Sequence, residues 1–131
     1  MIKKDILSAR LPNESTIFTA EAKAIQLAFE YIKTSNDRRF IIFSDSLSCL
    51  QSIKNMNIEH PFILDILKQY CILTKQNKTV EFCWIPSHIG IYGNTKADKA
   101  AKDALNFEIA EFRIPYTDLK FSIKKYVNSL W

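Results

Sequence analysis

The chain has 131 residues, of which 47% are hydrophobic and 24% are charged. This content predicts one folded domain with its own core and excludes a disordered tail. No apolar run reaches the roughly 18–20 residues that a membrane-spanning helix needs, so we expect no membrane segment. The residues near the start do not suit a signal peptide, which predicts an intracellular protein of the nucleus or cytoplasm, not a secreted one.

The net charge and the cysteines indicate the kind of partner and the redox state of the thiols. A net charge of +4 favours a phosphate-bearing partner, although many ordinary domains carry the same charge. Cys49, Cys71 and Cys83 are far apart and have no C-x-x-C spacing. They are typical of reduced, mostly buried thiols and predict neither a disulfide framework nor a zinc site.

The first part of the chain predicts a strand, a turn and a long helix. Residues 6–11 suit a short strand, and residues 12–15 suit a turn. Thr16 is of a type that caps helices, and a helix is expected from residue 17 to about residue 34. Apolar residues recur at helical spacing along this helix, at Ile17, Ala20, Ala24, Ala28 and Tyr31.

Two apolar segments in the middle of the chain predict strands. Residues 40–43 are a continuous apolar run, which indicates a strand buried on both faces, as in a parallel sheet. Residues 80–85 are rich in β-forming side chains. A helix to about residue 55 follows the first strand, and Pro61 suits the start of a helix that reaches about residue 74.

The last part predicts a loop and two helices. The loop covers residues 86–93, and a helix follows from about residue 94 to residue 105. Residues 117–130 place apolar side chains on one helical face. No internal repeat or Pro/Gly-rich linker divides the chain. Helices that alternate with buried strands indicate an α/β architecture.

Three carboxylates are candidate site residues. Glu21 lies in the apolar stripe of the first helix, where an unpaired charge is expensive; the alternative is a glutamate that reaches solvent. Asp45 follows the first strand, at the end where α/β sheets gather ligands; the alternative is an N-cap of the next helix. Asp98 lies near the start of its helix, where a negative charge is also favourable without any functional role.

A histidine completes the candidate site. His88 lies in the segment 87–93, which contains both glycines of the chain. Glycine permits unusual backbone angles, so we expect this segment to move or to adopt them. A histidine there is a candidate general acid or base. His60 has no such context and is expected to be a surface or capping residue.

The three carboxylates, without cysteine ligands, suit a hard ion such as Mg²⁺ or Mn²⁺. Two such ions about 4 Å apart can activate a water and stabilise a leaving oxygen in phosphodiester cleavage. The spacing alone does not establish that Glu21, Asp45 and Asp98 converge.

Four motifs occur in a specific order. They are Thr-Ala-Glu-Ala at 19–22, Phe-Ser-Asp-Ser at 43–46, Trp-Ile-Pro-Ser-His-Ile-Gly at 84–90 and Gly-Asn-Thr-Lys-Ala-Asp at 93–98. Together they resemble the ribonuclease H domain, in the form found in reverse transcriptases of non-LTR retrotransposons. The resemblance covers about residues 7–106.

The resemblance implies a role for each site residue. Glu21, Asp45 and Asp98 match the family's metal-binding carboxylates, with two ions in the complete site, and His88 matches a histidine that aids proton transfer or product release. The implied reaction is Mg²⁺-dependent endonucleolytic cleavage of RNA in RNA–DNA hybrids. The implied partners are such a hybrid, read by its shape and 2′-hydroxyls, and the rest of a reverse transcriptase polyprotein.

One departure concerns the front of the domain. The family begins with a strand that bears an aspartate, in a context like Tyr-Thr-Asp-Gly-Ser, and a second strand, and neither is found here. We expect an incomplete ribonuclease H-like mixed sheet flanked by helices, with parallel strands near 40–44 and 80–85. The truncated domain would cover residues 1–106, and residues 107–131 would be a C-terminal tail with one helix. The missing aspartate predicts impaired cleavage, and the missing strands predict exposed sheet edges.

Other interpretations stay open. One is a catalytically inactive nucleic-acid-binding or scaffolding remnant of a retroelement. Another is an unrelated α/β interaction domain whose acids are there by chance. The sequence does not decide the oligomeric state, the placement of the 6–11 strand, or whether the chain is a host gene product, a retroelement fragment or a mispredicted gene start.

Overall fold

The computed structural model describes residues 5–111 and 113–130, without the side chain of residue 121. Along this part of the chain, helices and strands follow one another as α1 (Ile17–Thr34), β1 (Arg39–Ser44), α2 (Leu47–Lys54), α3 (Pro61–Lys75), β2 (Thr79–Trp84), α4 (Tyr92–Ala104) and α5 (Tyr116–Ser129). This order confirms the predicted α/β class. In these stretches no helix combines the length and apolar character required to cross a membrane.

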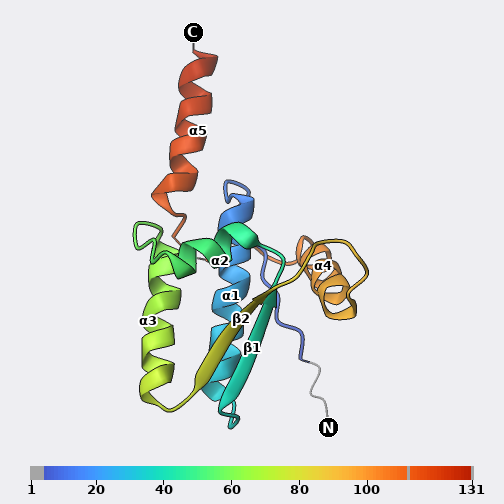
Figure 1. Ribbon diagram of the computed structural model, residues 1–131. Helices are drawn as coiled ribbons and strands as arrows, with labels where there is room; N and C mark the ends of the chain where they lie inside the picture. Colours follow the sequence, from blue (N-terminus) through green and yellow to red (C-terminus); the bar gives the residue numbers. More distant parts are fainter. Residues whose placement is uncertain (1–4, 112, 131) are drawn as a thin grey trace.

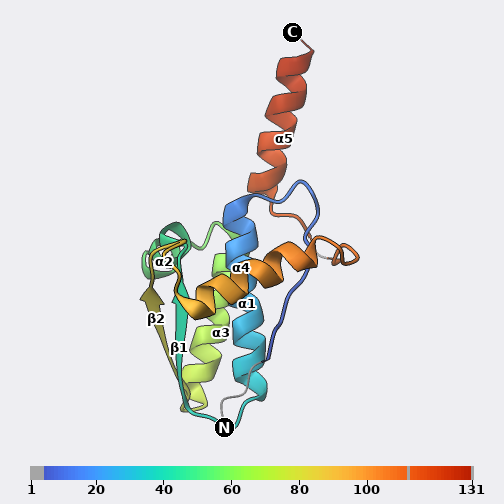
Figure 2. The same cartoon turned by 90° about the vertical axis from the view of Figure 1, so that its right-hand side faces the viewer.

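The sheet of the described residues consists of two parallel strands, as the sequence predicted. Phe40 lies opposite Val80, and Ser44 lies opposite Trp84. Figure 2 shows both arrows pointing to the same end of the molecule. The carboxyl ends of the strands therefore meet at one edge, where the predicted Asp45 follows β1.

Helices α1 and α3 cover one face of this sheet (Figure 2). The core between them is built mainly from apolar side chains of α1 and α3, closed by Val80 of β2. Alternate residues of β1 face away from it, so Ile41 is 56% exposed and Phe43 is 60% exposed. The prediction of a strand buried on both faces was wrong, because described helices pack on one side only.

The buried face of α1 also differs from the predicted one. The side chains that reach the core are Ala22, Ile25, Phe29 and Ile32, with Thr19 at the start of the row. Ile17, which headed the predicted stripe, is 81% exposed. The predicted stripe consisted mostly of alanines, whereas the observed stripe buries larger side chains and thus more apolar area. Thr16 is the N-cap, as predicted, and accepts a hydrogen bond from the backbone N–H of Thr19.

The segment before α1 does not form the predicted strand over residues 6–11. It makes one bridge, between Arg10 and Ile109, in which Ala110 N–H donates to Arg10 O at 2.8 Å. The predicted turn is present, since Ser15 N–H donates to Pro12 O at 3.0 Å. The segment does not pair with β1, because the sheet of the described residues contains only β1 and β2.

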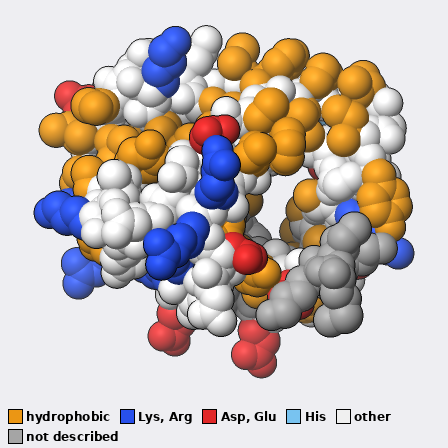
Figure 3. Space-filling model, turned by 60° about the horizontal axis from the view of Figure 1, so that its bottom comes forward, with side chains coloured by type: hydrophobic (Ala, Val, Ile, Leu, Met, Phe, Trp, Pro, Cys, Tyr) orange, Lys and Arg blue, Asp and Glu red, His pale blue; other side chains and the backbone are white. Residues whose placement is uncertain are grey.

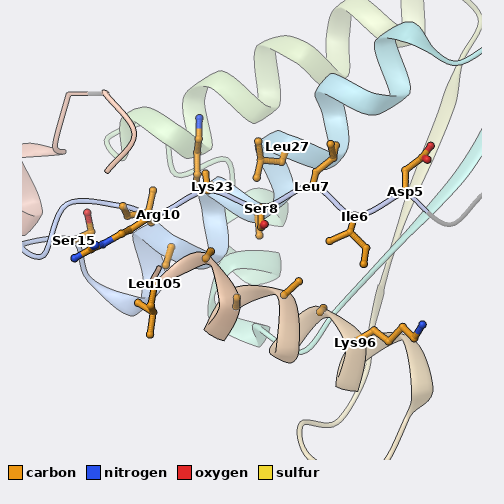
Figure 4. Close-up of a pocket in the computed structure, with 18 of the residues that line it drawn as sticks. Asp5, Ile6, Leu7, Ser8, Arg10, Ser15, Lys23, Leu27, Lys96 and Leu105 are labelled. Carbon is orange, nitrogen blue, oxygen red and sulfur yellow. The ribbon is translucent and has the colours of Figure 1, made fainter. Parts of the chain in front are cut away.

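A cavity of about 810 Å³ lies between the N-terminal segment, α1 and α4. Figure 4 shows Asp5, Ile6, Leu7 and Ser8 following its length, with Leu27 of α1 nearby. A smaller hollow continues to the edge of β1. An opening bordered by hydrophobic side chains is visible from below (Figure 3). Within the described residues, β1 has a strand on one edge only.

Helix α5 extends away from the rest of the molecule in both views (Figures 1 and 2). It is attached at its first turn by Asp118, whose exposed fraction is 2%. The Oδ2 atom accepts from the backbone N–H of Thr16 at 3.1 Å, and Oδ1 accepts from the hydroxyls of Thr16 and Thr19 at 3.0 Å each. Asp118 thus supplies a negative charge to the N-terminus of α1.

His60 joins the same polar group. Its Nδ1 accepts from the backbone N–H of Phe62 at 3.2 Å, so it caps α3, which was one of the two expectations. It is not a surface residue, because only 7% of it is exposed. Since Nδ1 accepts, Nε2 carries the proton and donates to Thr19 Oγ1 at 3.3 Å.

The cysteines are free, as expected, but not mostly buried. Cys49 is buried, whereas Cys71 and Cys83 are exposed. Burial raises the pKa of the Cys49 thiol, and the Glu21 charge raises it further, so this thiol stays protonated at neutral pH. Cys83 is exposed because it lies on the uncovered face of the sheet.

Candidate active site

Asp45 lies in the turn between β1 and α2, at the carboxyl end of the sheet. The cap of α2 is the next residue, Ser46, whose side chain accepts from the backbone N–H of Cys49 at 3.4 Å. The Asp45 carboxylate is therefore not a helix cap. Its Oδ2 instead accepts a hydrogen bond from Asn94 Nδ2, on α4, at 3.0 Å. This contact joins the sheet edge to α4.

Glu21 lies in the second turn of α1 and is half-buried. Burial raises the pKa of its carboxyl above the ordinary value, and the negative charges of Asp45 and Asp98 raise it further. A carboxylate from each of two other segments therefore acts on Glu21.

Asp98 lies in the second turn of α4 and not near its first residue, because the helix begins two residues earlier than predicted. Its side chain is 39% exposed, and Oδ2 lies 3.5 Å from Nδ1 of His88. Gly93, which we expected in the loop, is helical. The early start of α4 brings Asp98 beside the loop that carries His88.

The loop before α4 has an unusual backbone, as its glycine content suggested. Gly90 has a φ of 80°, and His88 has a φ of 55°. Such a conformation costs a non-glycine residue about 1–2 kcal/mol and is found preferentially at functional sites. The His88 side chain is 79% exposed, so it can contact a ligand as well as Asp98.

Pairwise contacts and charges link the four predicted residues. Electrostatic coupling joins Glu21 to Asp45 and Asp98, and His88 contacts Asp98. Carboxylate oxygens without sulfur ligands suit Mg²⁺ or Mn²⁺ by their chemistry. In the described stretches, however, no three His, Cys, Asp or Glu side chains are arranged so that they could hold a metal ion. The carboxylates as placed do not fit an ion held by three of them, and their metal role stays a prediction.

Asn94 is a site residue to which the sequence analysis assigned no role. It lies four residues before Asp98, so both side chains share one face of α4. This spacing was a usable signal, because an amide on the same face as a predicted site carboxylate lies close to that site. Through its bond to Asp45, Asn94 orients one carboxylate while Asp98 supplies another.

The comparison with known proteins shows the family of the chain. The family model described as RNase H matches residues 1–106, most of the chain. The chain therefore belongs to the ribonuclease H family. It has an α/β fold with a parallel strand pair flanked by helices, as expected for this family.

Its relatives among curated proteins are retroviral. The chain is 36% identical over 90 residues to the Pol polyprotein of equine infectious anemia virus (strain Wyoming). The aligned region makes up 63% of this chain and 7% of that protein. The Pol polyproteins of isolates 1369 and CL22 are each 34% identical over 90 residues, with the same coverage. The matched region is about 7% of the length of these relatives.

Proposed function

We propose that this domain acts on RNA–DNA hybrids by the ribonuclease H reaction, in which the RNA strand is hydrolysed. The observation that carries the proposal is the coupling of Glu21 to Asp45 and Asp98 at the carboxyl end of the strands. A carboxyl such as Glu21, whose pKa is raised by burial and by acids from two other segments, is typical of a catalytic site and not of a surface optimised for stability. Family membership supports the same conclusion.

The two other polar residues of the site take supporting roles in this proposal. His88 is exposed, lies on the strained loop and reaches Asp98, which suits proton transfer or product release. Asn94 keeps the Asp45 carboxylate turned toward α4. The positive net charge of the chain favours approach to the phosphates of a hybrid.

We propose that activity depends on Mg²⁺ or Mn²⁺ and is impaired in this chain on its own. Glu21, Asp45 and Asp98 have the donor chemistry for such an ion but are not gathered closely enough to hold it with three ligands. A fourth carboxylate, which the family resemblance implies and which no matching motif supplies here, would be needed as well. No step of the reaction is assigned to a metal ion for this reason.

An incomplete sheet would explain the loose arrangement of the acids. The second edge of β1 has no strand beside it among the described residues, and an apolar cavity of about 810 Å³ lies between α1, α4 and the N-terminal segment. We propose that further strands, from a longer chain or from another molecule, occupy this space. They would bring α1 and α4 into fixed positions on either side of the site.

The second candidate function is an inactive nucleic-acid-binding or scaffolding remnant of a retroelement. The lack of a three-ligand metal arrangement in the described part of the chain favours it. The Pol polyprotein relatives support an origin in a retroelement polyprotein. The non-LTR type, and the division into a domain over residues 1–106 and a tail over 107–131, stay predictions.

The test is a cleavage and binding assay with a labelled RNA–DNA hybrid, in Mg²⁺ and in Mn²⁺, with Asp45→Asn as the matched control. We expect the chain to bind the hybrid in preference to duplex DNA and to show no appreciable cleavage alone. Robust cleavage that Asp45→Asn abolishes would contradict the proposed impairment and support the reaction. A lack of any preference for the hybrid would contradict the proposed substrate.

A further inference from the structure

Helix α5 carries an apolar stripe with the spacing of a coiled-coil seam. Its members follow one another at intervals of three, four, three and four residues, which are the a and d positions of a heptad. They are Tyr116, Leu119, Ile123, Tyr126 and Leu130, with exposed fractions of 60%, 40%, 60%, 65% and 64%. Val127, which is 43% exposed, adds one e position to the stripe, but most of its members occupy a and d, as in the seam of a coiled coil. The pattern therefore indicates a second helix as its partner.

The direction of α5 is fixed even though its stripe is uncovered. Asp118 in its first turn is buried and accepts three hydrogen bonds from Thr16 and Thr19 at the start of α1. Beyond this anchor, the helix extends away from the body of the molecule (Figures 1 and 2). A helix that is attached at one end and exposed along its apolar stripe is suited to contact another molecule.

The charges of α5 identify the kind of partner. Lys120 occupies an e position beside the stripe, Lys124 lies one turn further along at a b position, and Lys125 lies at a c position, away from the stripe. The helix has one acid, Asp118, which is buried in the anchor. A second copy of the chain would bring lysines toward lysines, whereas a helix with acids beside its own apolar stripe would pair with Lys120 and Lys124.

Other binding modes fit these features less well. A bilayer surface favours a wider apolar face than a stripe made mainly of a and d positions provides. Phosphates of a nucleic acid would pair with the lysines but would leave the exposed apolar residues, such as Ile123, in water. An acidic amphipathic helix would cover the apolar stripe and would also pair with the lysines.

We propose that α5 is a docking helix for an acidic amphipathic helix of another polypeptide, which packs on the apolar stripe and places carboxylates against Lys120 and Lys124. This function is independent of the hydrolysis proposed for the carboxylate site. At about 1.5 Å per residue, the helix spans roughly 20 Å, so the contact is small and the complex is expected to be transient.

The test uses the full chain and two labelled synthetic peptides of three heptads, both with Ile at a and Leu at d. The acidic probe carries Glu at e and g, and the basic probe carries Lys there. In fluorescence anisotropy titrations, we expect the acidic probe to bind and the basic probe to bind at least tenfold more weakly or not at all. Ile123→Asp should abolish binding, with far-UV circular dichroism showing that the protein stays folded.

Two charge-reversal variants distinguish an ion pair with a lysine beside the stripe from general attraction between a basic helix and an acidic peptide. Lys120→Glu and Lys125→Glu change the net charge equally, but only Lys120 flanks the stripe. We expect Lys120→Glu to weaken binding of the acidic probe roughly fivefold and Lys125→Glu to weaken it less than twofold. Equal effects of the two, or no binding of the acidic probe, would overturn the proposal.

Two other outcomes would also overturn it. One is a dimer of the chain in analytical ultracentrifugation that Ile123→Asp dissociates, which would make a second copy the occupant. The other is binding of α5 to phosphatidylserine vesicles or to a nucleic acid duplex, lost in the same variant, without binding of the peptide.

Discussion

Replacing Asp118 with asparagine should unfold the protein at a much lower denaturant concentration. The wild-type carboxylate is 2% exposed and accepts three hydrogen bonds of 3.0–3.1 Å from Thr16 and Thr19. Bonds to a charged acceptor contribute about 1.5–3 kcal/mol each, roughly twice the value of neutral ones. Asparagine keeps an acceptor for the hydroxyls but turns an amide N–H toward the N–H of Thr16. We expect the free energy of unfolding to fall by about 2–4 kcal/mol.

The measurement is urea unfolding followed by far-UV circular dichroism, with Asp103→Asn as the control. Asp103 is exposed on α4, so its replacement should change the unfolding free energy by no more than about 0.5 kcal/mol. Hydrogen exchange adds a local readout, because release of the anchor should remove amide protection in α5 more than in α3. A change below about 0.5 kcal/mol for Asp118→Asn would refute the view that this carboxylate ties α5 to α1.

Three further predictions concern the site and the helix cap. Glu21→Gln should raise the free energy of unfolding at neutral pH, because it removes a half-buried charge that Asp45 and Asp98 repel. Since the pKa of Glu21 in the folded protein is raised above 4.5, the stability of the wild type should fall as the pH rises through that pKa. Urea unfolding at several pH values should therefore show a flatter dependence of stability on pH for the variant. Asn94→Ala should lower the unfolding free energy by about 1 kcal/mol, and an unchanged value would argue against its bond to Asp45. Burial lowers the pKa of His60 below 6.5, while Asp118 partly opposes the shift. The contribution of His60 to stability should therefore be fully present above pH 6.5 and be lost as the pH falls through the pKa of the folded protein. The melting temperature of His60→Gln, measured over the same pH range, should lack this loss.

Short-range sequence signals predicted the elements of the fold well. The turn at residues 12–15 is closed by a backbone hydrogen bond between near neighbours, and the Thr16 side chain bonds to the backbone N–H of Thr19, so both can be predicted from local sequence. The parallel pairing of β1 and β2 followed from two apolar runs separated by helices. The position of Asp45 followed from the polar residues that end the first run. The family motifs follow the same order along the chain as these elements.

The buried faces were harder to predict. In α1, alanines at helical spacing suggested one stripe, but the larger side chains around Phe29 define the buried one. In β1, a run of four apolar residues indicated burial on both faces, yet Ile41 and Phe43 face away from the core. Periodicity shows that a segment can bury a face, while the neighbours that pack against it decide which face is buried.

The four candidate site residues, Glu21, Asp45, Asp98 and His88, could be predicted from the sequence because each stands beside a recognisable local feature, such as a strand end or a glycine-containing loop. Only the tertiary structure decided how they interact. The bond from Asn94 to Asp45 and the anchor from Asp118 to Thr19 join residues that are 49 and 99 positions apart. Such contacts depend on how whole elements pack in three dimensions. The sequence therefore sufficed to predict candidate carboxylates, whereas the effect of Asp45 and Asp98 on Glu21, and the absence from the described residues of a three-ligand metal arrangement, depend on the fold.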